Sequence, residues 1–141
     1  MSKSLNSLQP WGSFFLRLVL GIAMAYHGYG DVIPAGGFHG GNTFSALDHY
    51  SHYIVSLGLP YWLGYVSAFT EFVGGILILL GLFTRFAAFM IAGNMLVALI
   101  TVNRHHGYSG SEYSLALFVI AVMSTFYGPG AVALDRRLNL A

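Results

Sequence analysis

Four apolar stretches, separated by short polar breaks, run through most of the chain. They cover residues 11–29, 61–83, 86–104 and 112–128. A helix needs about 20 apolar residues to cross a hydrocarbon core of about 30 Å, and each stretch comes close to that length. Thr84-Arg85 interrupts the pattern between the second and third stretches, and Gly128-Pro129-Gly130 ends the fourth. The pattern therefore predicts an all-α membrane protein built as a four-transmembrane-helix bundle.

The segment between the first two stretches, residues 30–60, follows a different pattern. Its first half is the glycine-rich run GDVIPAGGFHGGN, and in its second half Phe44, Leu47 and Ile54 recur at helical spacing. We therefore expect an extra amphipathic helix in the outer loop between the first and second spans. This helix would lie on the outer face of the membrane or fold over the mouth of the bundle. A mobile loop is the alternative.

Composition favours a lipid environment over a soluble fold. The chain is 56% hydrophobic and 8% charged, with a mean hydropathy of +0.68, whereas soluble domains are about 25% charged. A net charge of +1 does not provide the basic face that nucleic acids require. The absence of cysteine excludes disulfides, thiolate nucleophiles and cysteine-ligated iron–sulfur clusters. We expect one integral membrane domain over residues 1–141, with 129–141 as a cytoplasmic tail.

The placement of basic residues predicts the orientation of the bundle. With four spans both termini lie on one side, which then carries Lys3, Arg85, Arg136 and Arg137, while the opposite side carries Arg104. Cytoplasmic loops of membrane proteins carry the excess of lysine and arginine. Both termini are therefore predicted to be cytoplasmic.

Polar side chains inside the predicted spans are expected to find partners. A charged side chain at the bilayer centre costs about 2.5–3.5 kcal/mol on insertion scales. Arg17 interrupts the first stretch, Glu71 the second, and Asn94 lies near the middle of the third. A rise of about 1.5 Å per residue puts Arg17 and Glu71 within about one helical turn in depth. We therefore predict an Arg17–Glu71 ion pair with a further hydrogen bond from Asn94. Alternatively, such a pair only fixes helix packing.

The histidines gather at the outer end of this topology. All six fall at or beyond the outer boundary: His27, His39, His49, His52, His105 and His106. His49 and His52 would share a face of the loop helix and are the metal-ligand candidates, but no H-E-x-x-H signature occurs, so we expect no metal site. His27 and Glu112 would move protons between a buried ligand and water. Alternatively, His27 caps helix carbonyls and Glu112 pairs with Arg104.

Several motifs taken together resemble one family. The order LRLVLGIAMAYHGYG, TEFVGGILILLGLFTRFAAFMIAGNMLVAL, GSEYSLALFVIAVMSTFYGPGAVALD is similar to that of the DoxX family of four-helix bacterial membrane proteins. The most specific parts are the spacing from arginine to HG, the E-x-x-G-G-x-x-x-x-x-G-x-x-T-R of Glu71 to Arg85, and the E-Y followed by G-P-G-x-x-x-L-D at Glu112 and Asp135. The resemblance covers all four predicted spans.

The resemblance carries expectations of its own. One branch of the family is the small membrane subunit of a thiosulfate:quinone oxidoreductase, and other members are linked to oxidative-stress complexes. The family's polar residues fall on Arg17, His27, Glu71, Arg85, Asn94 and Glu112. Many members have a basic residue shortly after the HG, where this chain has Asp31, so a contact of that residue with a partner or headgroup is not expected here. The implied location is the bacterial cytoplasmic (inner) membrane.

Together these observations predict a membrane subunit of a quinone-linked oxidoreductase, with a quinone as ligand and no covalently bound cofactor. The residues assigned to the site are Glu71, Arg17 and His27 for catalysis and Asn94, Glu112 and Arg104 for ligand binding. Because the sequence holds no flavin, haem or nucleotide motif, a soluble or membrane redox partner protein would complete the enzyme; a homo-oligomer is compatible with the pattern. A non-catalytic membrane anchor or assembly subunit is the alternative, ahead of a small-solute carrier.

Overall fold

Five helices make up the part of the chain that the computed structural model describes, residues 2–34 and 42–140. They are α1 (Ser2–Val32), α2 (Thr43–Ser56), α3 (Tyr61–Leu80), α4 (Thr84–Tyr127) and α5 (Leu134–Arg137). Within these described residues, four segments are long and apolar enough to cross a membrane: Ser7–Val32, Tyr61–Leu80, Thr84–Thr101 and Gly107–Tyr127. The predicted all-α bundle of four membrane-spanning helices is therefore confirmed.

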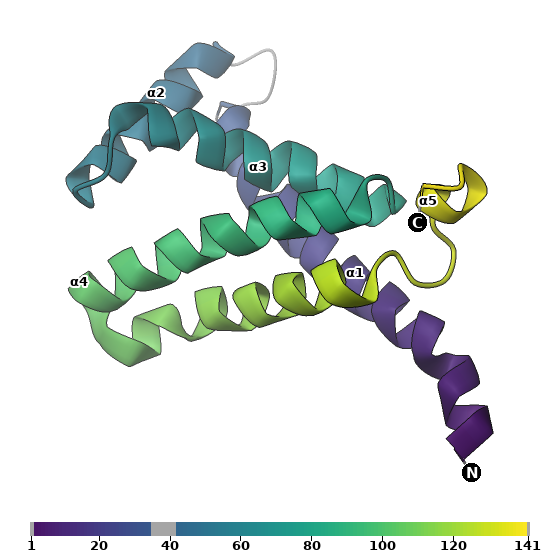
Figure 1. The fold of residues 1–141 in the computed structure, drawn as a ribbon. Helices are drawn as coiled ribbons and strands as arrows, with labels where there is room; N and C mark the ends of the chain where they lie inside the picture. Colours follow the sequence, from purple (N-terminus) through teal and green to yellow (C-terminus); the bar gives the residue numbers. More distant parts are fainter. Residues whose placement is uncertain (1, 35–41, 141) are drawn as a thin grey trace.

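The third and fourth spans are the two halves of one bent helix, α4. Gly107, in the middle of its 44 residues, has φ 69° and ψ −168°, a backbone conformation that residues other than glycine rarely adopt. The two halves run back alongside each other in Figure 1. Ser111 Oγ donates to the carbonyl oxygens of Gly107 and Tyr108 at 3.0 and 2.9 Å. The fourth span therefore begins at the bend, five residues before the start that the apolar pattern indicates.

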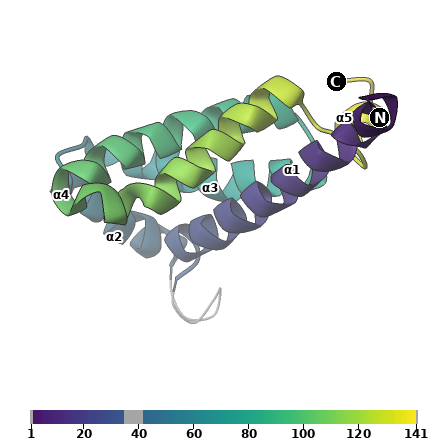
Figure 2. The ribbon, with the colours of Figure 1, turned by 90° about the horizontal axis from the view of Figure 1, so that it is seen from below.

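Glycines fix the register between α1 and α3. A Cβ on Gly28 would overlap the backbone nitrogen of Phe72, and one on Gly75 would overlap the backbone nitrogen of Ala25. Only glycine therefore allows the two backbones to come this close. In Figure 2, α3 lies between α1 and the hairpin of α4. The main buried cluster includes Leu20, Met24, Ile78, Ile91 and Ala121, contributed by all three helices.

The expected loop helix exists and folds over the bundle mouth. Asn42 caps α2 through its Oδ1, which accepts from the backbone nitrogen of Phe44 at 3.0 Å. Leu47 and Ser51 on α2 are buried, and a Cβ on Gly64 of α3 would overlap the Ser51 side chain. Figure 1 shows α2 at the end of the bundle opposite to α5. We call these two ends the α2 end and the α5 end.

The segment after α4 closes the α5 end. Asp135 accepts the backbone N–H groups of Phe83 and Thr84 at 2.7 and 2.8 Å, so its carboxylate caps the first turn of α4. Its own N–H donates to the Gly81 carbonyl at 2.8 Å. Ala131 N donates to the Pro10 carbonyl on α1 at 2.7 Å. The segment thus joins α1 to the α3–α4 turn.

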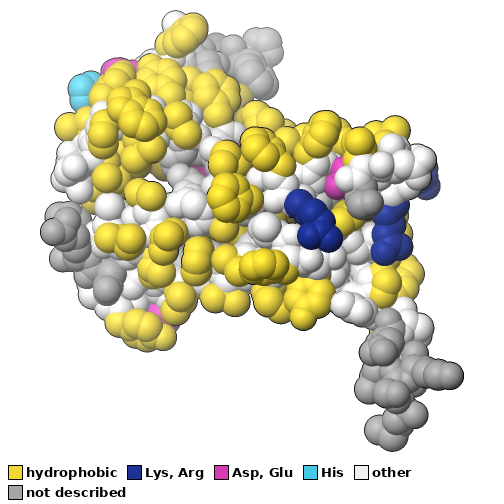
Figure 3. Space-filling view, viewed as in Figure 1, with side chains coloured by type: hydrophobic (Ala, Val, Ile, Leu, Met, Phe, Trp, Pro, Cys, Tyr) yellow, Lys and Arg dark blue, Asp and Glu magenta, His cyan; other side chains and the backbone are white. Residues whose placement is uncertain are grey.

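The surface is divided between apolar flanks and a charged end. In Figure 3, apolar side chains cover much of the visible flank, and Lys and Arg side chains gather toward the α5 end. Large side chains such as Phe15, Ile22, Phe89 and Phe126 are 60–72% exposed. A soluble monomer rarely exposes so much continuous apolar surface, whereas lipid tails cover it in a membrane. The chain is a multi-pass membrane protein.

Candidate functional site

The carboxyl group of Glu71, in the middle of α3, is held by uncharged hydrogen-bond donors. Its side chain is 7% exposed. Asn94 Nδ2 on the first half of α4 donates to Glu71 Oε1 at 2.8 Å, and Ser67 Oγ, one turn earlier on α3, donates to the same oxygen at 3.4 Å. The predicted hydrogen bond from Asn94 is therefore confirmed. No ion pair to Glu71 occurs among the side chains that the structure describes.

Tyr50 extends this chain of hydrogen bonds to α2. Its hydroxyl lies 3.0 Å from Ser67 Oγ. Because the single Ser67 proton is directed at Glu71, Tyr50 is the donor in its contact with Ser67. Burial raises the pKa of Tyr50 above its usual value, and the nearby Glu71 charge raises it further. Tyr50 therefore keeps its proton through the neutral pH range and acts as a hydroxyl.

A cavity of about 80 Å³ opens beside this chain, between α2, α3 and α4. Glu71, Asn94, Ser67 and Tyr50 provide its polar side. Its remaining wall is largely apolar and comes mainly from Ile54, Leu57, Leu59, Leu63, Val97 and Ala98. Ligand sites commonly combine apolar walls with a few convergent polar groups. Because its volume is below the roughly 300 Å³ of a small ligand pocket, the cavity suits the polar edge of a lipophilic molecule and not the whole molecule.

A second hollow lies on the other side of Tyr50. Asp31 and Ile33 at the end of α1 and His49 on α2 line it, together with Tyr50 and Tyr53. Since these two tyrosines line both spaces, they form a shared wall between the cavity and the outer hollow. The Tyr50 hydroxyl therefore stands at the boundary between the buried carboxyl group and the α2 end.

Arg17 is not part of this site, and the predicted Arg17–Glu71 ion pair is wrong. Arg17 is 1% exposed, and its Nη2 donates to the carbonyl oxygens of Val132 and Ala131 at 2.9 and 3.3 Å at the α5 end. Gly28 packs on the backbone of Glu71 and Phe72, so it marks the level of Glu71 on α1. Arg17 lies eleven residues before it, or about 16 Å away along the helix. The first turns of α1 extend beyond the bundle (Figure 1), so Arg17 is level with the α3–α4 turn and not with the middle of α3.

The other two predicted proton carriers also lie apart from the cavity. His27 is exposed on α1, and its ring centroid is 5.3 Å from that of Tyr113 on α4. Glu112, which immediately precedes Tyr113 on α4, is also exposed. Neither residue lines the cavity beside Glu71, and their roles in proton transfer stay predictions. The side chain of Arg104 lies outside the described residues, so its assigned contacts stay predictions as well.

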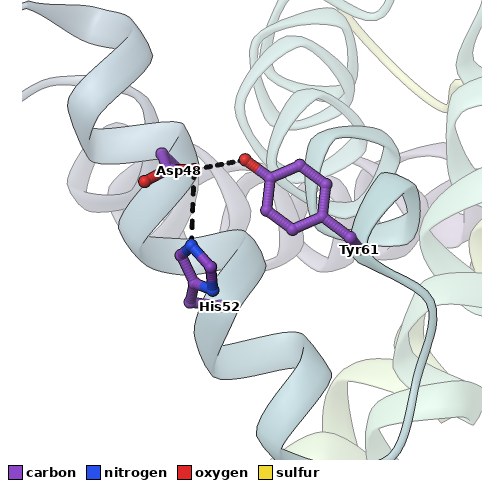
Figure 4. A network of polar contacts seen from close by, with 3 residues as sticks. All are labelled: Asp48, His52 and Tyr61. Carbon is purple, nitrogen blue, oxygen red and sulfur yellow. Dashed lines mark hydrogen bonds and ion pairs between the residues drawn. The ribbon is translucent and has the colours of Figure 1, made fainter.

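The two metal-ligand candidates have different neighbours. In Figure 4, Asp48 lies between His52 and Tyr61: His52 Nε2 is 3.6 Å from Asp48 Oδ1, and the Tyr61 hydroxyl donates to the same oxygen. The His52 side chain is 69% exposed, whereas His49 lines the outer hollow. Over the described residues, no three His, Cys, Asp or Glu side chains gather as metal ligands. His39 lies outside them.

The sequence reasoning missed two members of the site, Ser67 and Tyr50. Ser67 precedes Glu71 by four residues, so the helical period alone places both on one face. Tyr50 lies on the inner side of the amphipathic pattern of α2, between the buried residues Leu47 and Ile54. Its contact with Ser67 depends on how α2 folds over the bundle, which the periodicity of α2 alone does not specify.

Comparisons with known proteins give a consistent result. The DoxX family model matches residues 12–104, more than half of the chain. The chain is 28% identical over 125 residues to a Bacillus subtilis protein named "Putative oxidoreductase CatD", covering 88% of this chain and 84% of that protein. It is 30% identical over 142 aligned positions to an uncharacterized protein of Haemophilus influenzae, covering 95% of this chain and 96% of that protein. No solved structure matches the chain.

Proposed function

This chain belongs to the DoxX family, and from that membership and the surroundings of Glu71 we propose that it is the membrane subunit of a quinone-linked oxidoreductase. One observation carries the proposal: a buried carboxyl group, held by uncharged donors, forms the polar side of a cavity with apolar walls. The name of the Bacillus subtilis relative, which includes the word oxidoreductase, supports the redox part of the proposal.

The chemistry of quinone reduction matches the groups around the cavity. A quinone takes up two electrons and two protons to become a quinol, so its carbonyl oxygens need hydrogen-bond donors and a proton source. Asn94 supplies an amide donor, and no described residue donates to Glu71 Oε2, which leaves that atom for a ligand. The Glu71 carboxyl group would pass a proton to the ligand and regain one through the hydroxyls of Ser67 and Tyr50. At about 80 Å³, the cavity would receive the carbonyl edge of the ring against its apolar walls, and the tail would lie outside it among the lipid chains.

Electrons would come from a partner protein at either membrane surface. The sequence contains no flavin, haem or nucleotide motif, so the electron-carrying cofactor would belong to the partner. The arginine-rich α5 end would face the cytoplasm of a bacterial inner membrane, following the distribution of basic residues. Both termini lie toward this end (Figure 1).

Co-purification of quinone tests the proposal. The full chain, extracted in mild detergent from a quinone-producing bacterium, is analysed for retained quinone by mass spectrometry and by the ultraviolet difference spectrum on borohydride reduction. Glu71→Gln removes the ionisable proton of the carboxyl group and keeps the shape of the side chain. Glu112→Gln makes the same change at an exposed carboxyl group. We expect near-stoichiometric quinone in the parent and in Glu112→Gln, and at least a tenfold loss in Glu71→Gln.

Two outcomes would contradict the proposal. If the parent retains no quinone, even after incubation with a short-chain analogue, and Glu71→Gln changes only thermal stability, the chain acts as a non-catalytic anchor. If Glu112→Gln loses as much quinone as Glu71→Gln, binding does not depend on the cavity beside Asn94.

A further inference from the structure

A second binding site is indicated at the α5 end, away from Glu71. A groove of about 380 Å³ lies between the first turn of α4, the end of α4 and the segment around α5. It is lined by Arg85, Tyr127, Pro129, Gly130, Arg136 and Asn139. Two guanidinium groups, a phenol and an amide on one groove provide several donors for an anion.

The two arginines of this groove are not neutralised by carboxylates. Among the described side chains, the one ion pair within 4.0 Å joins Asp48 and His52 at the other end of the molecule. The nearest acidic residue in the sequence, Asp135, is 3% exposed, and its two oxygens accept the backbone N–H groups at the start of α4. The guanidinium groups of the groove therefore keep their charge available for an anion, and Lys and Arg side chains gather toward this end in Figure 3.

The backbone holds these groups in position. Arg85 Nη1 donates to the carbonyl oxygens of Thr125 and Phe126, both at 3.1 Å, which anchors the guanidinium at the end of α4. Asn139 has a positive φ of 56°, and its neighbour Leu140 donates its N–H to the Asp135 carbonyl at 2.8 Å. The groove is therefore built from fixed elements and not from a free tail.

Apolar surface adjoins the groove and decides between a free anion and a lipid. A neighbouring hollow shares Arg85 and Pro129 with it, and Phe83, Thr84, Phe86, Asp135 and Leu140 complete its lining. The Asp135 carboxylate is already paired there with two backbone N–H groups. Phe83, Phe86 and Leu140 are all more than half exposed. A soluble phosphate would gain nothing from this apolar side, whereas a phospholipid would place its phosphate between the arginines and its acyl chains along the phenylalanines.

We propose that the groove between Arg85 and Arg136 binds the phosphate headgroup of an anionic phospholipid from the membrane leaflet at the α5 end. The site is independent of the quinone proposal. It would hold one lipid in a defined place, beyond the general attraction of basic residues to an anionic membrane surface.

Lipid binding to two matched variants tests the proposal. The full chain in detergent is titrated with short-chain phosphatidylglycerol or phosphatidylcholine and followed by native mass spectrometry, with inorganic phosphate as competitor. Arg136→Gln removes a groove residue, and Arg137→Gln makes the same change at its exposed neighbour, which does not line the groove. We expect phosphatidylglycerol to bind at least fivefold more tightly than phosphatidylcholine. Arg136→Gln should weaken its binding about fivefold, since a basic residue near an anionic surface contributes about 1 kcal/mol, and Arg137→Gln less than twofold.

Three results would overturn the proposal. Equal binding of the two lipids removes the role of charge in headgroup selection. Equal weakening by Arg136→Gln and Arg137→Gln assigns the preference to diffuse surface charge. Displacement of phosphatidylglycerol by an equal concentration of inorganic phosphate identifies a free anion as the ligand. If phosphate does not compete at that concentration, the lipid assignment is supported.

Discussion

Removal of the Asp135 carboxylate should strongly destabilise the α5 end of the bundle. Asp135→Ala removes the acceptors of two backbone N–H groups, at 2.7 and 2.8 Å, and leaves the start of α4 uncapped. Hydrogen bonds to charged groups contribute about 1.5–3 kcal/mol each, and loss of an N-cap costs about 0.5–2 kcal/mol. The two figures describe the same contacts and are not added. Two hydrogen bonds at the lower end of the first range give an expected loss of about 3 kcal/mol in the free energy of unfolding.

A second variant separates the cap from the charge. Asp135→Asn keeps the shape and one carbonyl acceptor but removes the negative charge near Arg17, whose Nε and Nη1 lack hydrogen-bond partners. We expect a loss of about 1–2 kcal/mol for this change. Arg17→Met removes the buried positive charge. The loss of stability in the double variant Arg17→Met/Asp135→Asn should therefore be about 1 kcal/mol smaller than the sum of the two single losses.

Unfolding of the full chain in mixed micelles, titrated with sodium dodecyl sulfate and followed by far-ultraviolet circular dichroism, measures these differences. Glu112→Ala, at an exposed carboxyl group on α4, is the control and should lie within about 0.5 kcal/mol of the parent. An Asp135→Ala variant as stable as this control would refute the capping role. A double variant whose loss equals the sum of the single losses would refute the electrostatic coupling.

Two further predictions concern α1 and α2. Gly28→Ala should lower the free energy of unfolding by about 2–3 kcal/mol in the same titration, because the added Cβ meets the Phe72 backbone. Gly93→Ala, with nothing within 4 Å of its Cβ, should have little effect. Equal losses in the two variants would contradict the close approach of α1 and α3. Because the pKa of Tyr50 is raised, its contribution to stability is complete below the ordinary tyrosine pKa of about 10 and is lost as pH rises above it. Tyr50→Phe should therefore lose less stability than the parent in alkaline unfolding, and identical pH profiles would contradict the burial of this phenol.

The sequence predicted the elements of the fold better than their contacts. Long apolar stretches identify membrane helices because lipid leaves few alternatives for the backbone. The Asn94–Glu71 hydrogen bond was also predictable, since both residues lie near the middle of their spans and polar groups there need partners. The loop helix was visible in the spacing of Leu47 and Ile54.

The partner of Arg17 could not be predicted in this way. The first apolar stretch begins at Trp11, whereas α1 begins at Ser2 and its first turns extend past the α3–α4 turn. The register instead depends on where Gly28 and Gly75 allow the backbones to touch, a property of two helices at once. The carbonyl groups that accept from Arg17, those of Ala131 and Val132, lie 114 and 115 positions later in the chain, and no periodicity connects them to Arg17.

This long separation affects how the protein is made. The first span is synthesised with a guanidinium group that finds its carbonyl acceptors only when the residues following the fourth span emerge from the ribosome. Until then Arg17 has to stay at the lipid–water boundary or near the insertion machinery, since exposure to acyl chains is unfavourable. A nascent chain interrupted before Ala131 would keep this cation unsatisfied, and membrane proteases could use that difference to distinguish unfinished copies from finished ones.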